Sequence, residues 1–185
     1  MSADGVVLWF TGLSGAGKTT LARGLEVALA ERGVGVVVLD GDELRRTISA
    51  DLGFSRADRD ENLRRIAALA RREADAGRWV IVAAISPYVA QRLAARRACD
   101  SHVFIEIHVG TPLETCEARD PKGLYARARR GELPGFTGID DPYEAPNEDA
   151  PAEVMIDTTG RSVDATITDL LRRLRESLSR HSIGA

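Results

Sequence analysis

The sequence has little cysteine, few aromatic residues and no excess of positive charge. Its two cysteines, Cys99 and Cys116, form no CxxC pair, and the three histidines have no ligand-like spacing with them, which argues against a structural zinc site. We expect two buried free thiols in a reducing cytosol. The net charge of −3 argues against a surface that coats nucleic acid.

Long apolar runs are also absent. The longest has the length of a strand, so no segment is predicted to span a membrane. The N-terminus has no basic region followed by an apolar one, so we expect no signal peptide. A chain of 185 residues is most simply one domain, 1–185, with a sizeable core. We therefore expect a cytoplasmic protein with neither a nucleic-acid nor a membrane partner.

The most informative stretch is an apolar run, 6–10, that leads through Thr11 into Gly12-x-x-x-x-Gly17-Lys18-Thr19 and then into a helix-like segment. This is a Walker A motif with a strand before it and a helix after it, which disfavours a chance glycine-rich turn. Its glycines let consecutive backbone N–H groups surround a phosphate. We predict that Lys18 reaches the β- and γ-phosphates of a nucleoside triphosphate and that the Thr19 hydroxyl holds Mg²⁺.

Apolar runs and helical patterns alternate along the chain, which predicts an α/β fold: a parallel five-stranded sheet with helices on both faces. Strands are predicted at 6–11, 34–39, 80–84, 103–109 and 153–156. Helices are predicted at 18–32, at 56–76 and at 162–180, with two short helical pieces around 53–55. Another helix follows 85–88 and ends at about 98, and a further one begins with Thr111 as its cap. From 119 to 151 the pattern fails, and glycine, proline and charged residues predict a mobile lid at about 119–146.

Polar residues gather where the predicted strands end, which is where parallel sheets bind ligands. Asp40 and Asp42 could hold Mg²⁺-bound water or accept a proton from an acceptor hydroxyl, although Asp42 could instead cap the next helix. Arg45 and Arg46 follow within one turn, and Arg59 shares a helix face with Asn62; several arginines near a phosphate site suggest a second anionic substrate. Exposed salt bridges are the alternative for these arginines.

Phe54 is an aromatic residue in a polar loop, and it could stack on a base or belong to the core. It lies in one of several stretches in which the chain resembles the adenylylsulfate kinase (APS kinase) family of P-loop kinases. The Walker motif is common to many kinases, whereas two of the stretches, RDPKGLY and GFTGID, are far more specific. The matching stretches are GLSGAGKTT (12–20), LDGD (39–42), DLGFS (51–55), DRxENxRRI (58–66), ISPY (85–88), CEARDPKGLY (116–125), GFTGID (135–140) and PYEAP (142–146).

The resemblance implies a three-layer P-loop kinase fold with a mobile lid. It implies transfer of the ATP γ-phosphate to the 3′-hydroxyl of adenosine 5′-phosphosulfate (APS), giving PAPS and ADP for sulfate assimilation. Phe54 and Phe136 would sandwich the APS adenine, and Arg119 would stack on the ATP adenine. The implied ATP contacts are Gly12, Leu13, Ser14, Gly15, Ala16, Gly17, Lys18, Thr19, Thr20 and Arg119. The implied APS contacts are Asp42, Arg45, Phe54, Arg59, Asn62, Ile85, Ser86, Lys122, Gly135 and Phe136. The predicted Mg²⁺ ligands are Thr19, Asp40 and Asp42.

Lys18 and Asp42 are the predicted catalytic residues. The resemblance also implies a phosphoserine at Ser86, although in-line transfer to a hydroxyl needs no covalent step. We expect the lid, with its basic residues Lys122, Arg127, Arg129 and Arg130, to be open or poorly ordered without ligand and to close over the substrates.

The chain departs from the family pattern at Glu43, where an amide is usual. We expect it to lack the N-terminal segment of many relatives and a sulfurylase domain, to form a homodimer, and to have a functional link to a separate ATP sulfurylase. Two other functions are weighed: a different small-molecule P-loop kinase, for instance one acting on gluconate, and a nucleotide-dependent switch or inactive regulatory partner.

Overall fold

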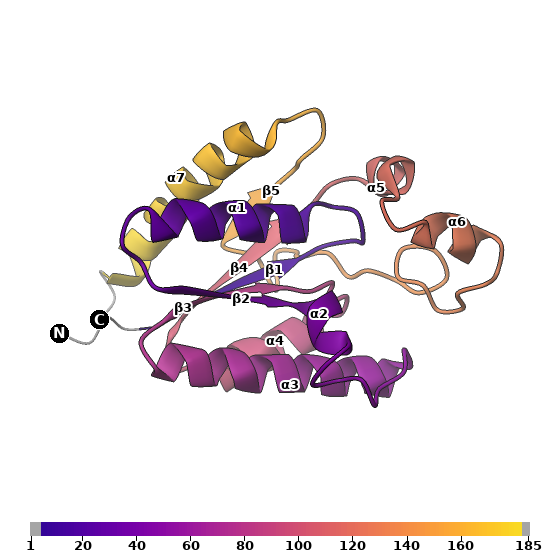
Figure 1. Cartoon of the computed structure of the whole chain (residues 1–185), viewed down its shortest axis with the longest axis horizontal. Helices are drawn as coiled ribbons and strands as arrows, with labels where there is room; N and C mark the ends of the chain where they lie inside the picture. Colours follow the sequence, from indigo (N-terminus) through magenta and orange to yellow (C-terminus); the bar gives the residue numbers. More distant parts are fainter. Residues whose placement is uncertain (1–4, 183–185) are drawn as a thin grey trace.

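The computed structural model describes residues 5–182 and shows a sheet of five parallel strands between two layers of helices (Figure 1). The strand order is β2-β3-β1-β4-β5. The strands are β1 (Val6–Thr11), β2 (Val36–Asp40), β3 (Trp79–Ala83), β4 (Val103–Val109) and β5 (Val154–Ile156). The helices are α1 (Lys18–Ala30), α2 (Gly41–Arg45), α3 (Arg56–Asp75), α4 (Val89–Ala98), α5 (Leu113–Arg119), α6 (Leu124–Arg129) and α7 (Val163–Ser182).

The central strand β1 is buried on both faces, which is why its sequence is continuously apolar. Leu8 and Phe10 point into the core cluster that α1 and α7 cover, whereas Val7 and Trp9 point into the cluster that α3 and α4 cover. Figure 1 shows these two helix pairs on opposite sides of the sheet. The predicted three-layer fold and parallel five-stranded sheet are therefore confirmed.

All five strands run in the same direction, so the segments that follow them leave from one edge of the sheet. The loop after β1, helix α2 after β2, the loop 84–88 after β3 and the loop 157–162 after β5 all begin there. The lid begins after β4 and α5, and its helix α6 projects beyond that edge (Figure 1). This arrangement brings five separate segments of the chain to one place.

The lid is rich in loops, as predicted, and holds one short helix, α6. Two local predictions are wrong. No helix forms around 53–55, and the short helix α2 lies earlier, at Gly41–Arg45. Thr111 does not cap α5, whose N-cap residue is Pro112. The Thr111 hydroxyl instead donates to the carbonyl of Ala16 at 3.1 Å and contacts the hydroxyl of Thr158 at 2.8 Å. A tertiary contact has thus replaced the expected local one.

Cys99 and Cys116 are both buried and free, as predicted. Within residues 5–182, no helix has the length and apolar character needed to cross a membrane.

The packing of α3 against the sheet can be tested at Ile66, which is fully buried. Ile66→Ala is expected to lower the free energy of unfolding by about 2–5 kcal/mol, because it removes buried methyl groups and leaves a cavity. The matched control is Val27→Ala on α1, where the side chain is 59 % exposed and the expected change is below about 0.5 kcal/mol. Urea denaturation measures both variants, and equal changes would contradict this account of the core.

Candidate active site

The loop between β1 and α1 has the backbone shape that a phosphate-binding loop needs. Gly12 has a φ of 146°, and a Cβ there would lie 2.5 Å from the carbonyl oxygen of Val109. Gly17, the N-cap residue of α1, has a φ of 104°. Only glycine adopts such conformations without strain, and the loop therefore delivers the unpaired N–H groups at the start of α1 to one point.

Lys18 folds back over this loop. Its Nζ donates to the carbonyl oxygens of Gly12 at 2.9 Å and Leu13 at 2.8 Å. Burial of the ammonium group lowers the pKa of Lys18 to about 8, and this outweighs the opposing effect of Asp42. A bound polyphosphate would favour the charged form, so the site is electrostatically prepared for an anion.

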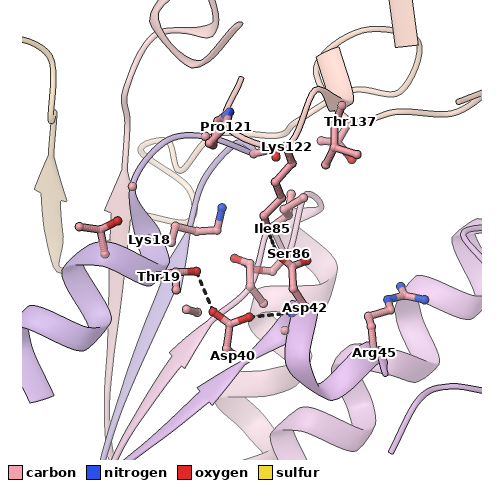
Figure 2. Close-up of a pocket in the computed structure, with 18 of the residues that line it drawn as sticks. Lys18, Thr19, Asp40, Asp42, Arg45, Ile85, Ser86, Pro121, Lys122 and Thr137 are labelled. Atoms are coloured by element: carbon pink, nitrogen blue, oxygen red, sulfur yellow. Dashed lines mark hydrogen bonds and ion pairs between the residues drawn. The ribbon is translucent and has the colours of Figure 1, made fainter. Parts of the chain in front are cut away.

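Thr19 and Asp40 form an oxygen-rich pair beside the loop (Figure 2). The Thr19 hydroxyl donates to Oδ2 of Asp40 at 2.7 Å, and Asp40 Oδ1 accepts from the backbone N–H of Asp42 at 2.9 Å. Hydroxyl and carboxylate oxygens are ligands that Mg²⁺ accepts, and Mg²⁺ commonly takes its other ligands from substrate phosphates and water. The described part of the chain holds no cluster of three or more acidic, histidine or cysteine ligands.

Asp42 does not cap α2, so that alternative is wrong. Asp40 is the capping residue, which leaves the Asp42 carboxylate facing the cavity. There it forms an ion pair with Lys122 of the lid. Asp42 is thus placed at the junction between the phosphate-binding loop and the lid.

A cavity of about 860 Å³ runs from the phosphate-binding loop to the start of α3. Figure 2 shows Lys18, Asp42, Arg45 and Lys122 around it. It brings together most of the predicted site residues: Ser14, Gly15, Gly17, Lys18, Thr19, Thr20, Asp40, Asp42, Arg45, Phe54, Arg59, Asn62, Ile85, Ser86, Arg119, Lys122 and Phe136. Four others do not line it, namely Gly12, Leu13, Ala16 and Gly135.

The far end of the cavity combines cations, an aromatic ring and an unpaired amide. The Arg45 guanidinium lies 4.9 Å from the centre of the Phe54 ring. Phe54 is 72 % exposed, so the alternative that it belongs to the core is wrong. Burial, together with the neighbouring charge of Arg59, lowers the pKa of Arg45. The buried Oδ1 of Asn62 has no hydrogen-bond partner among residues 5–182. These features suit a ligand that carries both an anionic group and an aromatic base.

Arg59 joins the loop before α3 to the lid. On the loop side, its Nε donates to the carbonyl oxygen of Phe54 at 3.0 Å. On the lid side, its Nη1 lies 3.2 Å from the Asp141 carboxylate. Further hydrogen bonds reach Thr137 and the carbonyl oxygen of Gly135. The exposed-salt-bridge alternative does not describe this residue, because its side chain is only 13 % exposed.

The comparisons with known proteins agree with this geometry. The model of the family described as "Adenylylsulphate kinase" matches residues 4–157. The chain belongs to the adenylylsulphate kinase family. The adenylyl-sulfate kinase of Klebsiella pneumoniae is 51 % identical over 179 residues, which are 97 % of this chain and 85 % of that protein. That of Lactiplantibacillus plantarum is 52 % identical over 92 % of this chain and 81 % of its own length.

Solved structures point the same way. The APS kinase of Mycobacterium tuberculosis, in complex with AMPPNP and APS, superposes with a TM-score of 0.88 at 46 % identity, over 93 % of this chain and 98 % of that one. A gluconokinase from Sinorhizobium meliloti has a TM-score of 0.64 at 16 % identity, over 100 % of this chain and 99 % of that one, a likeness that shows the fold alone.

The lid of this family member is docked in the structure. The Tyr125 hydroxyl donates to the carbonyl oxygen of Ser14 at 2.9 Å, and the Tyr88 hydroxyl donates to Asp141 at 2.8 Å. The expected opening of the lid in the absence of ligand stays a prediction. The lid's other basic residues form ion pairs outside the cavity: Arg129 with Glu117, and Arg127 and Arg130 with Glu132.

The sequence reasoning missed the segment after β5. Thr158 and Arg161 line the cavity, and Arg119 donates to the Thr158 hydroxyl at 2.7 Å and to its carbonyl oxygen at 3.0 Å. Arg46, which follows Arg45 in the predicted group of arginines, lines it as well, and Pro121, Thr137, Val163 and Thr166 line it without having been predicted. The signal for Thr158 was available, because this residue follows a predicted strand at the edge where ligands bind.

Ser86 is 2 % exposed, and its hydroxyl accepts a hydrogen bond from Trp9 Nε1 at 3.1 Å. The same hydroxyl lies 3.4 Å from the carbonyl oxygen of Ala84, to which it donates. Neither neighbour can act as a general base, and a nucleophilic serine needs one. The phosphoserine at Ser86 stays a prediction that this geometry does not favour.

The lowered pKa of Lys18 predicts a pH dependence of nucleotide binding. Above about pH 8, Lys18 of the free protein is mostly neutral. Bound MgADP should favour the charged ammonium, which takes its proton from the buffer, so binding takes up protons and weakens as the pH rises. Calorimetric titration at about pH 9, in buffers of different ionisation enthalpy, measures this uptake. Lys18→Arg keeps a permanent charge and should abolish the proton uptake. Equal proton uptake by both proteins would contradict the assignment.

Proposed function

We propose that this protein is an adenylyl-sulfate kinase, which transfers the γ-phosphate of ATP to the 3′-hydroxyl of APS and releases PAPS and ADP. The observation that carries the proposal is the single cavity that joins a phosphate-binding loop to an arginine- and aromatic-lined acceptor end. Family membership and the likeness to a kinase that binds AMPPNP and APS support the choice of acceptor.

The donor end would bind ATP through the loop 12–19. Lys18 would neutralise charge that develops on the transferred phosphoryl group, and the Arg119 side chain beside Thr158 would flank the adenine. Thr19 and Asp40 would hold Mg²⁺, which supplies charge neutralisation at the β- and γ-phosphates when it is bound with ATP.

The acceptor end would bind APS between Phe54 and Phe136, with Arg45 and Asn62 directed at its polar groups. Asp42 would orient the 3′-hydroxyl and accept its proton. Because phosphoryl transfer has a loose transition state in most analyses, positioning of the hydroxyl should matter more than proton removal. Lys122 would then exchange its ion pair with Asp42 for contacts to the substrates.

Three finer features remain proposals: a homodimer, a cytoplasmic location and a functional link to a separate ATP sulfurylase. An APS kinase from Thiobacillus denitrificans, 37 % identical and with a TM-score of 0.71, is described as hexameric. This chain covers only 29 % of that one, so the hexamer is not transferred to it.

The decisive experiment couples ADP release to a spectrophotometric signal with MgATP and APS. We expect APS-dependent turnover, no comparable turnover when APS is omitted, and none when gluconate replaces it. Lys18→Ala should lower kcat by about two orders of magnitude, the usual effect of losing one preorganised charge partner. Turnover on gluconate but not on APS would replace the proposed function with that of another small-molecule kinase.

Asp42 offers a test of the acceptor geometry. Asp42→Asn keeps the shape and one acceptor oxygen, so it should retain part of kcat, whereas Asp42→Ala should lose about two orders of magnitude or more. Asp51→Asn is the matched control, because Asp51 is similarly exposed but pairs with Arg65 away from the cavity. If Asp42→Ala turned over as fast as this control, the assigned role would be wrong.

A further inference from the structure

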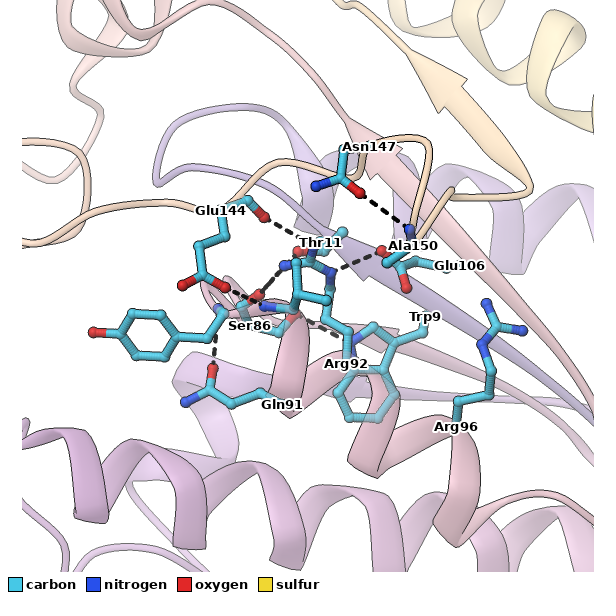
Figure 3. A network of polar contacts seen from close by, with 12 residues as sticks. Trp9, Thr11, Ser86, Gln91, Arg92, Arg96, Glu106, Glu144, Asn147 and Ala150 are labelled. Atoms are coloured by element: carbon cyan, nitrogen blue, oxygen red, sulfur yellow. Dashed lines mark hydrogen bonds and ion pairs between the residues drawn. The ribbon is translucent and has the colours of Figure 1, made fainter.

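A buried arginine outside the cavity connects the acceptor wall to the base of the lid (Figure 3). Arg92, on α4, has a side chain that is 1 % exposed and forms an ion pair with Glu106 of β4 at 2.8 Å. Its two remaining nitrogens donate to the carbonyl oxygens of Ser86 at 3.0 Å and Glu144 at 2.8 Å. One guanidinium thus contacts three segments that are distant in sequence.

The first of the two carbonyls belongs to a strained residue. Ser86 has a φ of 40°, a conformation that side-chain-bearing residues rarely adopt and that the surroundings must impose. Its carbonyl oxygen is held by Arg92, and the Thr11 hydroxyl, which donates to the adjacent carbonyl of Ile85 at 2.7 Å, lies 3.3 Å from it. Because Ile85 and Ser86 form a wall of the cavity, the shape of that wall depends on this turn.

The second carbonyl belongs to the C-terminal end of the lid. Glu144 also donates its backbone N–H to the carbonyl oxygen of Pro87 at 2.8 Å, and its carboxylate accepts from the backbone N–H of Val89 at 2.7 Å. The neighbouring Tyr143 hydroxyl lies 2.9 Å from that of Thr11. The lid therefore returns to the sheet against the same turn that forms the acceptor wall.

Only an arginine fits this place. Its planar group directs three nitrogens at fixed angles, whereas a lysine ammonium is a point charge that cannot reach all three acceptors at once. Glu106, whose side chain is 7 % exposed, balances the buried charge. Replacing Arg92 by alanine would leave Glu106 buried and unpaired, which destabilises the whole protein. Such a variant would not distinguish unfolding from a displaced acceptor wall.

We propose that Arg92 is a positioning residue for APS: by holding the carbonyls of Ser86 and Glu144, it sets the turn that forms the acceptor wall and fixes the end of the lid against that turn. The turn meets the start of the phosphate-binding loop through a long hydrogen bond from the Gly12 N–H to the Ile85 carbonyl at 3.4 Å, whereas Lys18 and Thr19 are held by contacts that do not involve the turn. The effect should therefore fall on the acceptor more than on ATP. This inference rests on the proposed function, because it concerns recognition of APS.

The test compares Arg92→Lys with Arg96→Lys. Arg96 lies on the same helix and pairs with Glu153 and the carbonyl oxygen of Phe104, but it contacts neither Ser86 nor Glu144. Arg92→Lys should raise the KM for APS about tenfold, the effect of losing one or two charge-assisted hydrogen bonds. The KM for ATP should stay within about twofold of the wild-type value, and Arg96→Lys should change neither constant.

Three results would overturn the proposal: an unchanged KM for APS, an equal rise in the KM for ATP, or the same effect from Arg96→Lys. If Arg92→Lys does not fold, the same measurements are made on Arg92→Gln combined with Glu106→Gln, which keeps a hydrogen-bonded neutral pair without the fork. That double variant must also raise the KM for APS selectively.

Hydrogen exchange separates this proposal from the proposed function, because it needs no activity. In Arg92→Lys without substrates, residues 85–88 and 142–145 should both exchange faster, while the phosphate-binding loop from Leu13 to Lys18 should not change. Unchanged exchange in those two segments would overturn the role of Arg92. Absence of APS-dependent turnover in the wild-type protein would instead overturn the proposed function.

Discussion

The structure depends on concentrating positive charge around one cavity. Lys18, Arg45, Arg59 and Lys122 all line it, and the protein only partly balances them with its own carboxylates. This concentration of charge has a cost: burial lowers the pKa values of Lys18 and Arg45, so their charged forms are less favourable than in water when no ligand is bound. A polyanionic pair of substrates would relieve this cost, so the same charges that strain the free protein provide binding energy.

The lid follows from this electrostatic constraint. Lys122 of the lid pairs with Asp42 of α2, and Arg59 of α3 pairs with Asp141 and the Gly135 carbonyl of the lid. These protein oxygens take part of the role that substrate anions would take. The Lys122–Asp42 pair is exposed and therefore weak, since solvent screens it and ordering the side chains costs entropy, whereas the Arg59–Asp141 pair is largely buried. Substrate phosphates can therefore displace the contact at Lys122, while the C-terminal end of the lid at Glu144 is held by the buried Arg92.

The buried pair of Arg92 and Glu106 costs desolvation energy, and an apolar pair of similar volume could be as stable. What apolar side chains could not supply is directed hydrogen bonding to the carbonyls of Ser86 and Glu144. The buried pair of Arg92 and Glu106 therefore contributes more to the geometry of the acceptor wall than to the overall stability of the protein.

The sequence by itself determined the phosphate-binding loop and the five strands, because glycine spacing and continuous apolar runs act over a few neighbouring residues. It also placed most of the cavity residues, through the rule that parallel strands bind ligands at their ends and through the family resemblance. Only the tertiary structure decided the strand order, helix α6 within the lid and the diversion of Thr111 from capping to a contact with Thr158. The pairing of Lys122 with Asp42, 80 positions apart, and the contacts of Arg92 were equally beyond local patterns, because they depend on which segments the topology brings together.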